Sequence, residues 1–80
     1  MFTEGEQQNM DKQEKFVISG RNIAKYRKVK GYSQNRFSEI LNISREHLAK
    51  IETAKRGISL GLLFKMSEVL NISEKSLFEG

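Results

Sequence analysis

The sequence predicts an all-α protein, a compact bundle of five short helices. A serine flanked by apolar residues recurs at intervals along the chain, and the apolar residues that follow each serine are spaced as on one face of a helix. Proline is absent, and no stretch alternates apolar and polar residues as a strand would. A chain of 80 residues is long enough for one domain. It contains no cysteine, so the core forms without disulfides.

The first residues differ in composition from the rest. They are rich in Glu, Gln, Lys and Asn and have no apolar periodicity. We expect residues 1–17 to be a polar, disordered tail or a frayed lead-in to the first helix, and residues 18–80 to form the folded domain.

Five serines predict where the helices begin: Ser19, Ser33, Ser44, Ser59 and Ser73. Each follows an apolar residue and precedes another by four positions, so the hydroxyl can cap the first turn while the apolar pair closes over it, with about 1 kcal/mol from each cap. Four of the five follow a residue that tolerates the left-handed conformation ending a helix, namely Gly31, Asn42, Gly57 or Asn71.

The helices are therefore expected near residues 20–30, 34–41, 45–53, 60–70 and 74–78. Such short helices are stable only when packed on one another. Helical spacing predicts a core made of Ile23, Tyr26, Phe37, Leu41, Leu48, Ile51, Leu60, Leu63, Phe64, Met66, Val69, Leu70 and Leu77.

Positive charge is concentrated in the middle of the chain. Residues 21–56 carry ten bases and three acids, whereas residues 1–15 carry two bases and four acids, and residues 57–80 carry two bases and three acids. A basic segment of this kind is typical of polyanion binding, but it is equally compatible with ordinary solvated helix faces.

Other function classes find little support in the residues. A single histidine, His47, without cysteine does not make a metal site, and no glycine-rich phosphate loop is present. The chain also lacks an apolar run of about 18 residues and the basic-then-apolar start of a signal peptide. We expect a cytoplasmic protein that is not an enzyme, needs no cofactor and has no membrane partner.

The most informative turn lies between the second and third helices. Only Asn42, Ile43 and Ser44 separate them. This is too short for an antiparallel hairpin, so the two helices should cross steeply as in a helix-turn-helix.

Six short motifs stand in a fixed order along residues 19–78. They are Ser33-Gln34, Ile43-Ser44-Arg45, Ile51-Glu52, Lys55-Arg56, Ser59-Leu60 and Asn71-Ile72-Ser73. In this order and spacing they resemble the phage repressor and Cro family (XRE-type) of helix-turn-helix DNA-binding domains. The resemblance implies a lambda-repressor-like fold, in which helices two and three form the helix-turn-helix and helix three reads double-stranded DNA.

The resemblance also implies roles for single residues. Arg45, Glu46 and Lys50 match the base-reading positions, and Arg or Lys can donate to guanine while Glu accepts from cytosine. Glu46 and Lys50 are also spaced to form an ion pair on a solvated face. Contacts to the DNA backbone, or mixed contacts, are implied for Gln34, Ser44, Thr53, Lys55 and Arg56. The imidazole of His47 can also bond a phosphate or a base.

Some of these residues have plainer explanations. Gln34 can be an exposed polar residue, Ser44 a helix cap alone, and His47 an ordinary surface histidine. Arg27 and Glu52 match a structural salt bridge that joins helices one and three.

The sequence therefore predicts a sequence-specific DNA-binding transcriptional regulator, a repressor or controller protein that binds a palindromic operator as a homodimer. Leu62 and Phe78 are candidates for the dimer surface. The alternative is a protein-interaction module, such as an antitoxin-like partner, on the same fold. The sequence does not identify a small-molecule or protein effector.

Overall fold

The computed structural model describes residues 12–80, which contain helices and no strand. The elements are α2 (Lys12–Val29), α3 (Gln34–Leu41), α4 (Arg45–Glu52), α5 (Leu60–Leu70) and the 3-10 helix η1 (Glu74–Phe78). The prediction of an all-α protein is confirmed.

The last element corrects the expected fifth α-helix. In η1 the Ser76 N–H donates to the Ser73 carbonyl, three residues back, at 3.0 Å. This is the bonding pattern of a 3-10 helix, which suits a segment of only five residues. The described part of the chain therefore has four α-helices and one 3-10 helix.

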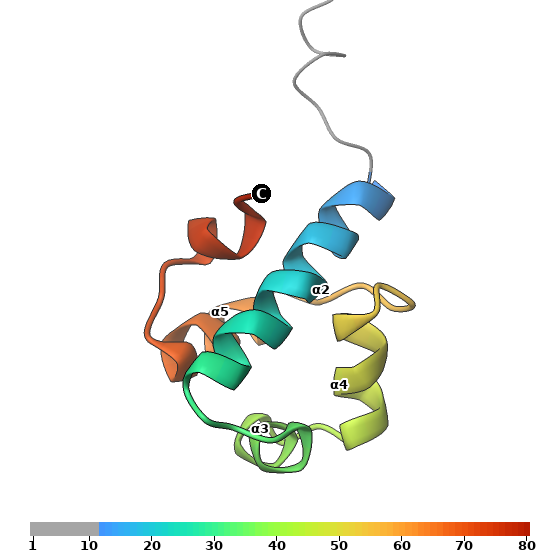
Figure 1. Ribbon diagram of the computed structural model, residues 1–80. Helices are drawn as coiled ribbons and strands as arrows, with labels where there is room; N and C mark the ends of the chain where they lie inside the picture. Colours follow the sequence, from blue (N-terminus) through green and yellow to red (C-terminus); the bar gives the residue numbers. More distant parts are fainter. Residues whose placement is uncertain (1–11) are drawn as a thin grey trace, which may run out of the picture.

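The long helix α2 is the element on which most others pack. It contacts α4, α5 and η1, whereas α3 contacts α4 and α5. Figure 1 shows α2 running diagonally through the molecule, with α4 on one side and the C-terminal segment on the other. Every element contributes to the buried core, which contains Ile23, Phe37, Leu41, Leu48, Ile51, Leu63, Met66, Leu70 and Leu77.

Four of the five predicted serine caps are present. The hydroxyls of Ser33, Ser44, Ser59 and Ser73 each accept a hydrogen bond from the backbone N–H three residues later. The apolar residue before each of these serines packs against the core, as expected for a hydrophobic staple. At the first of them the rings of Tyr32 and Phe37 stack with centroids 5.7 Å apart.

The fifth predicted cap, Ser19, is wrong. Helix α2 was expected to begin near residue 20 but begins at Lys12. Ser19 therefore lies buried inside the helix, where its hydroxyl donates to the Phe16 carbonyl at 3.3 Å. Part of the predicted tail, residues 1–11, lies outside the described residues, so the division into residues 1–17 and 18–80 stays a prediction.

Two predicted core residues on α5 are also wrong. Leu60 and Phe64 are exposed to 64% and 48%, whereas Tyr26 and Val69 are partly buried against the core. Leu62 and Phe78, which we expected at a dimer surface, are partly buried against the same core. The exposed apolar surface of α5 is thus offered by Leu60 and Phe64 instead.

Two polar or small residues fix how α2 meets its neighbours. A side chain at Gly20 would collide with the carbonyl oxygens of Ile51 and Glu52, so glycine allows the close approach of α2 and α4. Asn22 donates to the carbonyls of Leu77 and Glu79 at 2.9 and 2.8 Å, which ties the C-terminal segment to α2. None of the helices in residues 12–80 combines the length and apolar character needed to cross a membrane.

Candidate nucleic-acid interface

The turn between α3 and α4 sets the direction of the candidate reading helix. Asn42 has φ 61° and ψ 42°, the left-handed conformation that asparagine tolerates, and its N–H donates to the Glu39 carbonyl at 3.1 Å. Ser44 then caps α4 by accepting from the His47 N–H at 2.9 Å. Figure 1 shows the result, with α3 viewed nearly end-on beside α4.

The outward face of α4 carries the three predicted base-reading residues. Arg45, Glu46 and Lys50 are all exposed, and His47 is partly buried beside them. Lys50 Nζ lies 3.7 Å from the Glu46 carboxylate, with the two side chains 49% and 78% exposed. An ion pair this open to water is weak, so both groups stay accessible to a ligand.

The inward face of α4 is anchored to α2 by a buried salt bridge. Arg27 donates to both carboxylate oxygens of Glu52, from Nε at 2.7 Å and from Nη2 at 3.1 Å. Its Nη1 also donates to the Tyr32 carbonyl at 2.9 Å. The side chains of Arg27 and Glu52 are only 8% and 5% exposed, so the pair fixes the orientation of α4 with good bidentate geometry.

Gln34 connects this buried pair to the outward face. Its Nε2 donates to Glu52 Oε1 at 2.9 Å, and its Oε1 accepts from Arg45 Nη1 at 3.3 Å. One amide thus joins the salt bridge to a predicted base-reading residue. The contact of Gln34 with a phosphate stays a prediction, and it would have to use the remaining N–H of this amide or the backbone of the first turn of α3.

The loop after α4 adopts a path that the sequence did not reveal. Thr53 donates from Oγ1 to the Ala49 carbonyl at 2.8 Å, which folds its side chain back on the helix. The left-handed residue is Ala54, with φ 61°, and not Gly57 as expected. Lys55 and Arg56 follow Ala54 and are both exposed.

The first turns of α2 hold this loop in place. Gln13 donates to the Ala54 carbonyl at 3.4 Å. A β-carbon at Gly57 would lie 2.8 Å from the tip of the Phe16 ring, so glycine at this position makes room for the ring. Sequence reasoning missed Gln13 and Phe16 because both lie in the predicted tail, although the apolar run that begins at Phe16 was a usable signal.

The predicted residues therefore fall into three places. Arg45, Glu46 and Lys50 lie together on the outward face of α4, and Gln34 reaches them from the start of α3. Lys55 and Arg56 lie in the loop after α4. Exposed cations are thus presented along α4 and beyond its end, which suits an extended polyanion better than a small ligand.

Comparison with known proteins matches this arrangement to one family. The sequence model of the helix-turn-helix family matches residues 23–77. The uncharacterized HTH-type transcriptional regulator YazB of Bacillus subtilis (strain 168) is 42% identical over 60 residues, which are 75% of this chain and 87% of that protein. In the same organism, the SPbeta prophage-derived uncharacterized HTH-type transcriptional regulator YonR is 38% identical over 61 residues, which are 76% of this chain and 56% of that protein.

Solved structures show the same fold. The restriction-modification controller protein C.AhdI from Aeromonas hydrophila superposes with a TM-score of 0.73 at 27% identity, over 79% of this chain and 96% of that one. The hypothetical transcription factor NHTF from Neisseria superposes with a TM-score of 0.77 at 24% identity, over 85% of this chain and 76% of that one, and at this identity it supports the fold alone.

Proposed function

This chain belongs to the helix-turn-helix family, and we propose from that premise that it is a sequence-specific regulator of transcription that binds double-stranded DNA in the cytoplasm. One observation carries the proposal. Helix α4 is locked on its inner face by the buried Arg27–Glu52 pair, while Arg45, Glu46 and Lys50 project from its outer face without a strong partner.

The side chains on the outer face have the chemistry to read bases in the major groove. Arg45 and Lys50 are suited to donate to guanine O6 and N7, and Glu46 to accept from the amino group of cytosine, each with about 1–3 kcal/mol of discrimination. Glu46 also has Lys50 within reach. Its carboxylate therefore keeps a cationic neighbour if no cytosine is present.

The remaining predicted residues are assigned to the DNA backbone. Gln34, Ser44 and His47 lie at the starts of α3 and α4, and Thr53, Lys55 and Arg56 lie at the end of α4 or after it. Backbone contacts on both sides of a reading helix fix its register without reading sequence.

We infer further that the protein binds a palindromic operator as a homodimer and acts as a repressor or controller protein. Two copies of α4 would then lie about 34–36 Å apart on one face of the duplex. The controller function stated for C.AhdI, together with the likeness of the two folds, favours this form of regulation.

The test is a selection of bound sequences from a random duplex pool, followed by affinity measurements on the selected site. Arg45→Ala and Lys50→Ala should each weaken specific binding about 10- to 100-fold and relax the preference at one base pair. Lys75→Ala, which removes an exposed charge from η1, is the control and should have little effect.

If both variants on α4 kept the affinity and base preference of the wild type, α4 would not be the reading helix. If the wild type showed no salt-dependent binding to duplex DNA, the function as a DNA-binding regulator would fail. That second outcome would favour a protein-interaction module on the same fold.

A further inference from the structure

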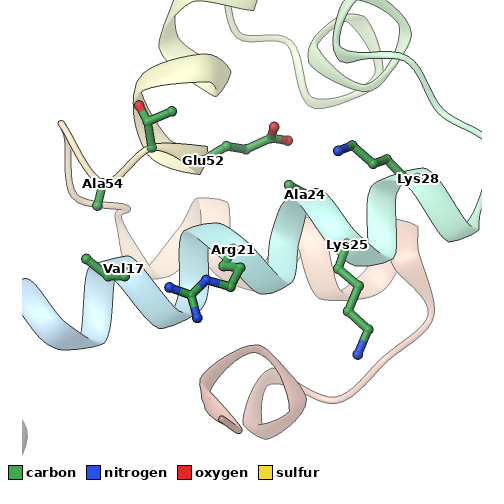
Figure 2. A pocket seen from close by; sticks show the side chains of 8 residues that line it. Val17, Arg21, Ala24, Lys25, Lys28, Glu52 and Ala54 are labelled. Atoms are coloured by element: carbon green, nitrogen blue, oxygen red, sulfur yellow. The ribbon is translucent and has the colours of Figure 1, made fainter.

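A basic groove on α2 shares only Thr53 with the DNA contacts assigned above. It is an open groove of about 470 Å³ between α2 and the end of α4. Three cations line it, Arg21, Lys25 and Lys28, and its apolar lining comes from Val17, Ala24 and Ala54. Figure 2 shows Lys28 extending toward Glu52, whereas the side chains of Arg21 and Lys25, on the same stretch of α2, point away from Glu52.

The spacing of the three cations makes a row. They occupy positions i, i+4 and i+7 of one helix, which lie along one side of it. Seven residues of helix rise about 10 Å, and successive phosphates of a strand advance about 3.4 Å along a duplex. The row is therefore long enough to meet more than one phosphate.

The charges in this row are not used within the described residues. Arg21, Lys25 and Lys28 are exposed, and none of their charged side-chain groups makes a hydrogen bond or salt bridge to another residue in 12–80. Lys25 has one cation–π contact, with Nζ 5.6 Å from the centre of the Tyr26 ring.

The acid in the lining does not cancel this charge. Glu52 is the one acid among the described residues that line the groove, and its side chain is only 5% exposed. Both of its oxygens accept hydrogen bonds from Arg27, and one also accepts from Gln34. Arg27 thus compensates Glu52, and the groove keeps the charge of its three exposed cations.

We propose that this groove binds phosphate, and that the phosphates belong to the DNA backbone beyond the base pairs that α4 reads. The groove ends at Thr53 and Ala54, directly before Lys55 and Arg56 in the loop. It therefore continues the row of backbone contacts proposed for that loop. The inference rests on the proposed DNA-binding function and extends its footprint.

A free phosphorylated ligand shares this chemistry but fits the groove less well. The groove is open, and its cations are at the ends of flexible side chains. A small anion would meet few of them at once, whereas a duplex presents several phosphates together. The test separates the two sources.

The test compares two double variants that remove the same charge. The groove variant, Arg21→Gln/Lys28→Gln, removes two positively charged side chains from the groove. The control variant, Lys65→Gln/Lys75→Gln, removes two positively charged side chains from α5 and η1. The groove residues are exposed, so their variant should melt like the wild type. The affinity is measured as a function of salt concentration on two duplexes. One is the selected operator alone, and the other is the operator lengthened on each side by about 10 base pairs, one helical turn.

We expect the groove variant to lower the slope of log affinity against log salt by up to about 1.8, at about 0.9 for each phosphate no longer neutralised. The ratio of the wild-type affinity to the variant affinity should then fall about tenfold between about 50 and 200 mM salt. The wild type should gain affinity from the extra base pairs, the groove variant should lose that gain, and the base preference should stay unchanged. The control variant should keep both the slope and the gain.

Two results would overturn the proposal. If the groove variant matched the control variant in slope and in its response to the extra base pairs, the groove would bind no DNA, while the regulator function would stand. If inorganic phosphate without DNA raised the melting temperature of the wild type saturably above potassium chloride of equal ionic strength, and the groove variant lacked this effect, the groove would serve a free anion. Failure of the wild type to bind any duplex would instead remove the proposed function itself.

Discussion

The two ends of α4 are flanked by residues with the same positive φ, yet they are held in different ways. Before α4, the left-handed residue is Asn42, with φ 61°, and Ser44 caps the helix two residues later. After α4, it is Ala54, also with φ 61°. Asparagine tolerates this conformation, whereas alanine is disfavoured in it by about 1–2 kcal/mol.

The start of α4 is therefore encoded by the residues that form it, and its end by residues far away in the sequence. Gln13 bonds to Ala54 across 41 positions, and Arg27 bonds to Glu52 across 25. Phe16 packs on Gly57 in the same corner. Long-range packing from α2 thus holds a conformation that the local sequence does not favour.

The largest effect should come from breaking the buried pair at the end of α4. Glu52→Ala leaves the Arg27 guanidinium buried without its carboxylate, which should lower the free energy of unfolding by about 3–5 kcal/mol. Urea denaturation of the variant and the wild type measures this difference in the free energy of unfolding.

Glu46→Ala is the matched control on the same helix. It removes an acid from an exposed pair, so the loss should be about 0.5 kcal/mol or less. Equal losses for the two variants would show that the Arg27–Glu52 pair does not anchor α4.

The next largest effect is expected from Phe16→Ala, which removes the ring that packs on Gly57. The ring is partly buried, so the variant should lose about 2 kcal/mol of unfolding free energy. Amide hydrogen exchange should quicken in the loop after α4 but not at Asn42 or Ser44. Val29→Ala is the control, because Val29 is 73% exposed. Faster exchange at both ends of α4 would remove the distinction between them.

At the start of α4 a smaller loss is expected. Ser44→Ala deletes the acceptor of the His47 N–H and should cost about 1 kcal/mol in thermal or urea unfolding. Ser44→Asp restores an acceptor and should recover most of the loss. If aspartate were as destabilising as alanine, capping would not explain how this end is encoded.

The smallest effect should have the opposite sign. Ala54→Gly relieves the disfavoured φ of 61°, and after the greater backbone entropy of glycine in the unfolded chain is deducted, it should stabilise the protein by about 0.5 kcal/mol. Ala49→Gly, within α4, is the control and should destabilise by about 1 kcal/mol. A destabilising Ala54→Gly would mean that the loop is not strained.

Helix ends and caps that depend only on neighbouring residues were predictable from the sequence. The segments Asn42-Ile43-Ser44 and Asn71-Ile72-Ser73 encode a left-handed stop followed by a cap, and both adopt this geometry. The start of α2 was not predictable in this way, because the helix runs back into a polar segment. Its first residues, Lys, Gln and Glu, favour a helix by propensity, and Gln13 and Phe16 add contacts to the loop after α4.

The exposed face of α5 shows where periodicity stops being informative. Seven of the ten residues from Leu60 to Val69 are apolar or glycine, so several faces of the helix satisfy an apolar pattern. Only the positions of the neighbouring helices decide that Leu63 and Met66 are buried and Leu60 and Phe64 are not.

For the candidate site, the resemblance assigned Arg45, Glu46 and Lys50 to base-reading positions, and all three are exposed on α4. The sequence could not reveal the partners of Gln34, since an amide bonds to whatever the fold brings beside it. The link from Glu52 through Gln34 to Arg45 joins three elements of the sequence only in the folded chain.

That link bears on the entropy of binding. A free arginine side chain has about 2 kcal/mol of rotamer entropy to lose when a ligand holds it in one arrangement. Gln34 already restrains the Arg45 guanidinium at 3.3 Å, so part of this loss is incurred when the chain folds. An operator would therefore meet a side chain that is partly ordered in advance, and the association would retain more of its contact energy as affinity.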